Sequence, residues 1–314
     1  MGSEFHQIQW DPALRDEVAG VLRLAVREDL GPLGDSTSKA LIPKAATGAA
    51  EVIARQGGIV AGLPAAAIAV HLIDSSLQWT PDTSDGDRVT PGQRVARLEG
   101  PARGILAAER LMLNLLARLS GLATLARRYV EAVAGTPARI YDTRKTTPGW
   151  RRLEKYSVRV GGACNHRTGL FDAILIKDNH LAFGRESTWG TALFSAAEAV
   201  AHARQWIKRR VPQLVRSRMI VEIEVDSLEQ LDEVLPAGPD IVLLDNMTPT
   251  QLREAAARRN ARAPAVELEA SGGVTLETVR QVAETGVERI SVGAITHSCP
   301  ALDFGLDWVH AAAP

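Results

Sequence analysis

Apolar side chains recur at helical spacing near the start of the chain. In "DPALRDEVAGVLRLAVREDL", residues 11–30, Leu14, Val18 and Leu22 share one face of a helix. Asp11 is suited to cap this helix, and Pro12 to occupy its first position. The pattern therefore predicts a helix over residues 11–30.

A second apolar stripe predicts a longer helix over residues 105–133. Its apolar face carries Ile105, Ala108, Met112, Leu115, Leu119, Leu122, Ala126, Tyr129 and Val133. Gly121 is a position at which this helix could divide. The opposite face carries Arg110, Asn114 and Arg118 at steps of four, so these side chains lie above one another along the helix.

Between these helices, residues 49–98 have a different texture. The short apolar stretches "AEVIAR", "GGIVAGL", "SSLQWTP" and "QRVARLEG" alternate with Gly, Pro and Asp. This pattern predicts an antiparallel sheet, with one helix near residues 64–74.

From residue 139 onward, apolar strands alternate with helical segments, which predicts a parallel α/β fold. The predicted strands are "ARIYDTRK", "DAILIKDNH", "IVEIEVDS", "DIVLLDN", "VELEASGG" and "RISVGAI". No dinucleotide-binding glycine fingerprint opens the first strand-to-helix turn. We therefore favour a barrel somewhat short of eight strands over an open doubly wound sheet, and expect polar strand ends to meet at its mouth.

Composition narrows the class of protein. The chain has 314 residues and is 46% hydrophobic, yet no apolar run approaches the roughly 20 residues of a membrane span. No signal peptide is evident, and "GSEF" near the start resembles the remnant of an expression tag. The two cysteines, Cys164 and Cys299, suit a reducing compartment. These features predict a cytoplasmic protein without a membrane partner.

Positive charge is concentrated in one part of this nearly neutral chain. Residues 139–167 carry eight Lys or Arg and two acids, so 8 − 2 gives a local charge of +6, whereas the whole chain carries −1. A pI near 6.7 argues against a nucleic-acid partner, so we expect a small anionic ligand. The candidate ligand-binding cations are Arg144, Lys145, His166, Arg167, Lys177 and, from the long helix, Arg110. For Arg151, Arg152 and Arg159 we favour a solvated helix face with ion pairs.

Two acids, Glu224 and Asp245, end neighbouring predicted strands. They could hold Mg²⁺, directly or through water, together with substrate phosphates, or stabilise a developing cation. Glu222, Glu224 and Asp226 share one face of their strand, and the position nearest the strand end should reach the mouth. The alternative is that these acids belong to a network inside the barrel.

Glycine-containing turns close the last two predicted strands. They comprise Ser271, Gly272 and Gly273 in "SGGV", and Gly293, Ala294 and His297 in "SVGAITHS". Backbone N–H groups at such turns bind phosphate. A polyanionic ligand, Mg²⁺ and a phosphate site together suggest transfer from a phosphorylated sugar.

The motifs resemble those of quinolinate phosphoribosyltransferases, the decarboxylating nicotinate-nucleotide pyrophosphorylases of NAD synthesis. The resemblance rests on "TRKTTPGWRRLEKYSVRVGGACNHR", "DAILIKDNH", "VEIEVDSLEQLDE", "DIVLLDNM", "LEASGGV" and "ISVGAITHS". It extends through "EDLGPLGDSTS", "GIVAGLP" and "GPARGILAAERLMLNLLARLSGLAT", and so covers nearly the whole chain in order.

The resemblance implies two domains and a homodimer with shared active sites. An N-terminal α/β sandwich would comprise residues 1–120 joined by 298–314, and an incomplete, about seven-stranded α/β barrel would comprise residues 121–297. Each sandwich would cover the partner's barrel mouth and bring Arg110 to it.

The resemblance also implies residue roles. Arg144, His166, Arg167 and Lys177 would hold the carboxylates of quinolinate. Lys145 and Lys177 would lie near phosphoribosyl pyrophosphate, Glu224 and Asp245 at the ribose and Mg²⁺, and residues 271–273 and 293–297 at the 5-phosphate. Lys145, Glu224 and Asp245 are the implied catalytic residues.

One segment departs from the family pattern. The segment 181–219 is longer than the resemblance leads us to expect and contains the basic run Lys208–Arg210.

Other functions stay open. The alternatives are a paralogous phosphoribosyltransferase with another acceptor base, such as the relative found with molybdenum transport genes, and a barrel that binds ligands without turnover. Intact Lys145, Glu224 and Asp245 weigh against the second.

Overall fold

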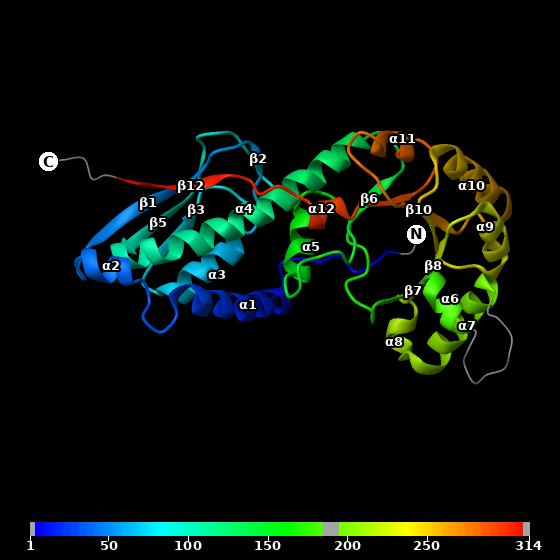
Figure 1. Ribbon diagram of the computed structural model, residues 1–314, viewed down its shortest axis with the longest axis horizontal. Helices are drawn as coiled ribbons and strands as arrows, with labels where there is room; N and C mark the ends of the chain where they lie inside the picture. The colour runs from blue at the N-terminus through cyan, green and yellow to red at the C-terminus, as the bar shows by residue number, and fades with distance from the viewer. Residues whose placement is uncertain (1–3, 185–194, 310–314) are drawn as a thin grey trace. The chain divides into compact units, whose positions relative to one another are not determined.

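The computed structural model of the chain describes residues 4–184 and 195–309 (Figure 1). It divides into two compact units, each built from separate stretches of chain. Of the described residues, the sandwich unit contains 8–127, 146–162 and 295–309, and the barrel unit contains 4–7, 128–145, 163–184 and 195–294. Residues 4–7, 121–127, 146–162 and 295–297 are grouped differently here than in the division expected from the resemblance, which was 1–120 with 298–314 against 121–297. No helix among the described residues is long and apolar enough to cross a membrane.

The sandwich unit contains the predicted antiparallel sheet. Its strand order is β12-β1-β5-β3, with β1 (Thr47–Ala54), β3 (Gln78–Pro81), β5 (Arg94–Pro101) and β12 (Phe304–Trp308). The C-terminal strand β12 pairs with β1, so the end of the chain completes the N-terminal sheet as expected. A separate two-stranded sheet joins β2 (Gly58–Ile59) to β4 (Arg88–Val89).

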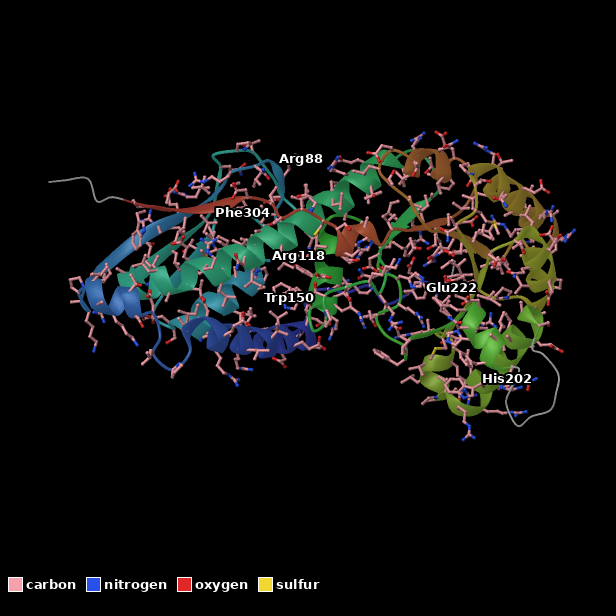
Figure 2. All side chains as sticks on the ribbon, viewed as in Figure 1. Arg88, Arg118, Trp150, His202, Glu222 and Phe304 are labelled. Atoms are coloured by element: carbon pink, nitrogen blue, oxygen red, sulfur yellow. The ribbon has the colours of Figure 1, made fainter. Side chains whose placement is uncertain are left out.

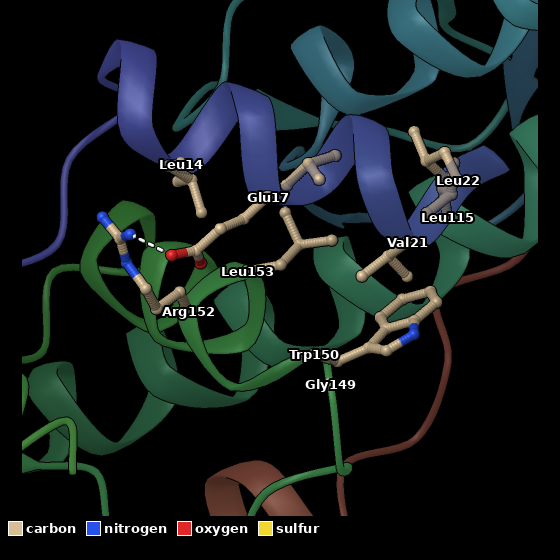
Figure 3. Close-up of a pocket in the computed structure, with 10 residues that line it drawn as sticks. Leu14, Glu17, Val21, Leu22, Leu115, Gly149, Trp150, Arg152 and Leu153 are labelled. Atoms are coloured by element: carbon tan, nitrogen blue, oxygen red, sulfur yellow. Dashed lines mark hydrogen bonds and ion pairs between the residues drawn. The ribbon is translucent and has the colours of Figure 1, made fainter. Parts of the chain in front are cut away.

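Helices bury the apolar face of this sheet. Those assigned wholly or partly to the unit are α1 (Pro12–Leu30), α2 (Ser36–Leu41), α3 (Leu63–Ile73), α4 (Ala102–Ala132), α5 (Arg151–Val160) and α12 (Ala294–His297). The core joins Val52, Leu98 and Phe304 of the sheet to apolar residues of α3 and α4 (Figure 2). On the other side of α4, Leu14 and Leu22 of α1 face Leu115 and Leu153 (Figure 3).

The first helix forms as the sequence predicts. Asp11 caps α1 by accepting a hydrogen bond from the backbone N–H of Leu14 at 2.7 Å, and Pro12 is the first helical residue. Leu14, Val18 and Leu22 are its buried residues. Capping and amphipathic spacing are both local properties of the sequence, so this helix could be predicted from the sequence alone.

The barrel unit contains a six-stranded, fully parallel sheet of order β6-β11-β10-β9-β8-β7. The strands are β6 (Arg139–Tyr141), β7 (Ala173–Ile176), β8 (Ile220–Val225), β9 (Ile241–Asp245), β10 (Glu267–Ser271) and β11 (Arg289–Ser291). Each coincides with one of the six predicted strands. A parallel bridge between Tyr141 and Cys164 adds a further extended segment beside β6, as an incomplete barrel requires.

Helices surround these strands (Figure 1). They are α6 (Asp178–Gly184), α7 (Ala196–Arg210), α8 (Gln213–Arg216), α9 (Leu228–Val234), the 3₁₀ helix η1 (Leu235–Ala237), α10 (Pro249–Arg262) and α11 (Val279–Ala283). The N-terminal segment also belongs to this unit: Phe5 is buried, and Glu4 forms an ion pair with Arg139. Glu4 and Phe5, the last two residues of "GSEF", are therefore part of the folded barrel unit.

Helix α4 runs without a break through Gly121, so the possible division there does not occur. Glycine is needed for a different reason. A Cβ at position 121 would lie 2.1 Å from the backbone oxygen of Pro300, which belongs to the segment leading to β12. The glycine therefore lets the C-terminal segment pass against the helix.

This contact gives a stability prediction. Gly121→Ala should lower the unfolding temperature, with a cost of about 1–3 kcal/mol, because the obstructing atom is backbone and cannot rotate away. Gly20→Ala in α1 is the control: no atom lies within 4 Å of its Cβ position, so the variant should gain about 0.5–1 kcal/mol from helix propensity. An unchanged melting temperature for Gly121→Ala would contradict the packing argument.

Candidate active site

The register of the parallel strands places the polar residues on one face. Glu224 is level with Leu243, Leu243 with Glu269, and Glu269 with Arg289. Residues that are level in neighbouring strands point to the same side, as do residues two apart within one strand. Glu222, Asp245 and Ser271 therefore belong to this face too. Figure 2 locates the Glu222 side chain within this unit.

At the carboxyl ends of the strands, this face carries the predicted acids. Glu224 and Asp245 are partly buried, and Asp245 is level with Ser271 of the next strand. Lys177, directly after β7, forms a close ion pair with Glu224. Asp245 accepts a hydrogen bond of 2.7 Å from the side-chain amide of Asn246. The barrel thus brings Lys177, Glu224, Asp245 and Ser271 to one rim.

Two arginines lie close enough to repel each other. Arg144 follows β6 and is partly buried, whereas Arg167 is 6% exposed. Burial lowers the pKa of Arg167, and the positive charge of Arg144 lowers it further, although Glu222 and Asp172 act in the opposite direction. Lys145 follows Arg144 and is exposed. A buried guanidinium whose charge is opposed by burial and by a second arginine is suited to binding an anion.

His166 has partners on both ring nitrogens. Nδ1 accepts a hydrogen bond of 2.8 Å from the backbone N–H of Arg167. Nε2 lies 3.2 Å from a Glu222 oxygen and 3.3 Å from a Glu269 oxygen, and the ring packs on Phe5 with centroids 4.3 Å apart. The ring is therefore fixed in orientation, and it holds the backbone at Arg167.

The two glutamates beside His166 have different surroundings. Glu269 also lies 3.2 Å from Nε of the fully buried Arg289, which in turn contacts Glu267 at 2.7 Å. Burial opposes ionisation of Glu269, but His166, Arg289 and Ser291 outweigh it and lower its pKa. Burial raises the pKa of Glu222, and the charge of His166 offsets that only in part. Of the two glutamates, Glu222 is therefore the one whose protonated form the surroundings favour.

Among the described residues, His166, Glu222 and Glu269 form the one group of three side chains whose potential metal-ligating atoms lie close enough together to share an ion. The tautomer argues against a metal ion there. Because Nδ1 accepts the N–H of Arg167, the ring proton of neutral His166 is on Nε2, the atom that faces the carboxylates. That atom is a donor to Glu222 and Glu269, so it has no lone pair for a metal ion. We assign this interior cluster a structural role in holding Arg167.

The two glycines after β10 have left-handed backbone conformations. Gly272 and Gly273 have positive φ angles of 98° and 60°. A Cβ on Gly272 would lie 2.1 Å from the side chain of Asn246, whereas nothing lies within 4 Å of one on Gly273. The backbone N–H of Asn246 donates to the oxygen of Ser271 at 2.8 Å, which joins the ends of β9 and β10. Gly293 and Ala294 follow β11 in the same position at the next strand end.

Two predicted site residues are not among those that the barrel unit brings together. Arg110 is exposed on α4 in the sandwich unit, and His297 is exposed at the end of α12, with Nδ1 2.5 Å from the Ser298 hydroxyl. Sequence reasoning missed Glu269 and Arg289. The alternation of Glu267 and Glu269 in "VELEASGG" was a usable signal, because both fall on the face that carries Ser271.

Known proteins match the chain over almost its whole length. Residues 35–120 match "Quinolinate phosphoribosyl transferase, N-terminal domain" and residues 122–307 match its C-terminal domain. The chain belongs to the quinolinate phosphoribosyltransferase family. This confirms the resemblance on which the residue roles were predicted.

Relatives in this family come from bacteria and plants. Nicotinate-nucleotide pyrophosphorylase [carboxylating] of Mycobacterium leprae is 42% identical over 93% of this chain and 97% of its own length. Quinolinate phosphoribosyltransferase [decarboxylating] 1 of Nicotiana glauca is 39% identical over 92% and 82%. The nicotinate-nucleotide pyrophosphorylase structure from Francisella tularensis superposes with a TM-score of 0.84, at 35% identity over 97% of this chain and 99% of that one. These matches confirm the fold class, a sandwich followed by an incomplete barrel.

The segment that departs from the family pattern contains α7 and α8. Serine 195 caps α7 through a capping box with Glu198, and Val200, Ala203 and Ile207 are buried. Residues 185–194 lie outside the described part of the chain. The basic run Lys208–Arg210 forms the last turn of α7, where positive charge stabilises a helix end.

The interior cluster predicts how stability depends on pH. Burial opposes a charge on His166, but Glu222 and Glu269 outweigh it and raise its pKa to about 10. Because Nδ1 accepts the N–H of Arg167, the additional proton belongs to the side of the cluster where Nε2 faces the two carboxylates, and the cluster as a whole keeps it above neutral pH. The unfolded chain releases that proton near pH 6.5. Because the folded state then binds more protons, this contribution is complete below pH 6.5 and is lost as pH rises through about 10.

Thermal unfolding between pH 6 and pH 10 measures this contribution. Glu222→Gln mimics the protonated acid, so its unfolding temperature should fall less steeply with pH than that of the wild type. Comparing the two removes the contribution of other groups that titrate in this range. Parallel curves would contradict a proton shared by the cluster.

Proposed function

We propose that this protein transfers the phosphoribosyl group of phosphoribosyl pyrophosphate to quinolinate with decarboxylation. The products would be nicotinate mononucleotide, pyrophosphate and CO₂, and the protein would be a pentosyltransferase of NAD biosynthesis. The names of its relatives support this reaction. The observation that carries the proposal is the rim itself, where the ends of neighbouring parallel strands bring Lys177, Glu224, Asp245 and Ser271 to one face.

Quinolinate recognition would depend on arginine side chains, one of which is fixed in position by His166. Arg144 and Arg167 would bind the carboxylates through paired hydrogen bonds, and Lys177 would add a point charge. Both ring nitrogens of His166 already have partners, so it would act by fixing Arg167 and not by direct contact. This changes the role that the resemblance suggested for His166.

Phosphoribosyl pyrophosphate would occupy the strand ends. Lys145 would neutralise its pyrophosphate, and the turns at Ser271–Gly273 and Gly293–His297 would bind its 5-phosphate through backbone N–H groups. The positive φ angles of Gly272 and Gly273, and the open space beside Gly273, are compatible with close approach of a phosphate.

Glu224 and Asp245 would serve the ribose and Mg²⁺. Both are partly buried carboxylates on one face of adjacent strands, and hard oxygen donors of this kind suit Mg²⁺ bound jointly with phosphate oxygens. When bound, Mg²⁺ would neutralise charge that develops on the departing pyrophosphate. The donor set therefore fits the ion, and these two residues would hold it directly or through water.

The same carboxylates would assist the chemistry. As the bond from ribose to pyrophosphate breaks, positive charge develops on the ribose, and Glu224 and Asp245 would stabilise it while the pyridine nitrogen attacks. The nitrogen then becomes cationic and withdraws electrons from the ring. The adjacent carboxylate leaves as CO₂, its bonding electrons stay on the ring carbon, and a proton adds there.

We also propose a homodimer with shared active sites. Arg110 is exposed on α4, where it would reach a partner's barrel mouth. In the loop after Arg167, Leu170 and Phe171 are 73% and 80% exposed. Large apolar side chains beside a ligand-binding arginine are suited to being covered by a second copy.

The choice of acceptor tests the proposed reaction. Quinolinate with phosphoribosyl pyrophosphate and Mg²⁺ should release CO₂ and pyrophosphate, and a chelator should stop the reaction. Nicotinate lacks one carboxylate and would leave a buried cation unpaired, so its kcat/KM should be lower by roughly four orders of magnitude. Comparable turnover of nicotinate would sink the assignment to quinolinate and favour a paralogue with another acceptor.

Subunit complementation tests the shared site. Arg110→Ala and Lys145→Ala homodimers should each be nearly inactive, because one lacks the cation from the partner and the other the resident cation. In a heterodimer one site has both defects and the other has neither. After equal random mixing, activity should recover to roughly a quarter of the wild-type sites. If subunit exchange is verified by labelled chains and activity stays at the parental level, Arg110 does not act in a partner's site.

A further inference from the structure

Arg118, on the polar face of α4, is bound to two separate segments of the sandwich unit (Figure 2). Its Nη2 donates to a Glu154 carboxylate oxygen at 2.7 Å and to the backbone oxygen of Thr296 at 2.6 Å. Its Nη1 lies 3.1 Å from the sulfur of Cys299. One guanidinium therefore joins α4 to α5 and to the segment before β12.

Glu154 extends this connection to a third segment. Its side chain is fully buried on α5. It accepts a hydrogen bond from the Thr147 hydroxyl at 2.8 Å and one from the backbone N–H of Thr147 at 3.2 Å. A buried carboxylate with an arginine and two further donors has a fixed orientation, because any rotation would leave charge unpaired. The ion pair thus fixes the turn before α5 relative to α4.

Both segments held in this way adjoin residues of the proposed substrate site. Thr147 lies two residues after Lys145, and Thr296 immediately precedes His297. We propose that Arg118 and Glu154 are a positioning pair for phosphoribosyl pyrophosphate: they fix the backbone of Thr147, next but one to Lys145, and of Thr296, next to His297. This inference rests on the proposed function, and it adds two residues that contact no substrate.

The alternative is an ion pair that only stabilises the fold, and kinetics separates the two. A positioning role predicts a substrate-specific defect, because a small displacement of the phosphate ligands weakens one substrate's binding. Arg118→Lys keeps the positive charge but cannot contact Glu154 and Thr296 with one planar group. Glu154→Gln keeps the shape but removes the charge. In both variants the KM for phosphoribosyl pyrophosphate should rise by about ten-fold or more, while the KM for quinolinate stays within about two-fold.

A neighbouring ion pair supplies the matched control. Arg152, also on α5, contacts Glu17 of α1 at 2.6 Å on a more exposed surface (Figure 3). Arg152→Lys makes the same change of side chain at an ion pair that joins α5 to α1 and contacts neither Glu154 nor Thr296. It should leave both KM values within about two-fold of the wild type.

A third variant tests the positioning role even if Arg118→Lys or Glu154→Gln does not fold. Thr147→Val deletes the hydroxyl donor to Glu154 but leaves the ion pair intact, so the fold should persist. The KM for phosphoribosyl pyrophosphate should still rise, by about three-fold or more, for loss of one hydrogen bond to a charged group. Unchanged KM values for phosphoribosyl pyrophosphate in the folded variants would overturn the positioning role, as would an equal rise for both substrates.

Calorimetry with phosphoribosyl pyrophosphate alone keeps this test separate from the proposed reaction. If the wild type binds it but does not turn over quinolinate, the proposed function fails, while weaker binding by the variants would still support the positioning pair. If the wild type does not bind it, both proposals fail. If the wild type turns over quinolinate and the variants bind phosphoribosyl pyrophosphate as tightly as the wild type, only the positioning pair is overturned.

Discussion

The contact of Glu269 with Arg289 and His166 is the interaction on which the barrel depends. A carboxylate with no exposure to solvent is costly unless cations and donors surround it. Arg289 neutralises Glu269 from the neighbouring strand, and His166 approaches it from the loop after the Cys164 bridge. Because the ring of His166 is fixed on that side, its other nitrogen can hold the backbone of Arg167. A charge inside the barrel thereby fixes the backbone at Arg167.

The predicted cationic segment divides into groups with different functions. Arg139 pairs with Glu4, and Arg152 with Glu17, as exposed helix and strand residues commonly do. Lys155 is fully buried on α5. Arg151 and Arg159 also lie on α5, in the sandwich unit. That leaves Arg144, Lys145 and Arg167, with His166, for the proposed site and its support. The number of positive charges in this segment overstates the size of the anion site, because neighbours in the sequence belong to two different units.

The elements of the fold could be predicted, but several of their partners could not. Periodicity and strand ends identified α1, the long α4 and all six parallel strands, because these signals are local. They also placed Glu224, Asp245 and Ser271 on a common rim. Pairing between distant segments is not local: the contact of Gly121 with Pro300, and the contact of Glu269 with Arg289, depend on which segments the fold brings together. Sequence pattern alone therefore read Gly121 as a possible break and passed over Arg289.

The polar face of α4 shows why equal spacing does not give equal function. Arg110 and Arg118 are eight residues apart on the same face, and a rise of 1.5 Å per residue separates them by roughly 12 Å along the helix. At residue 118 a buried carboxylate on α5 meets the guanidinium, whereas Arg110 is left exposed. An arginine side chain is too short to span that separation, so Arg110 cannot reach the atoms that Arg118 binds at Thr296 and Glu154. Arg110 therefore takes no part in holding the turn before α5 or the segment before β12, so the two arginines of one helix face have different functions.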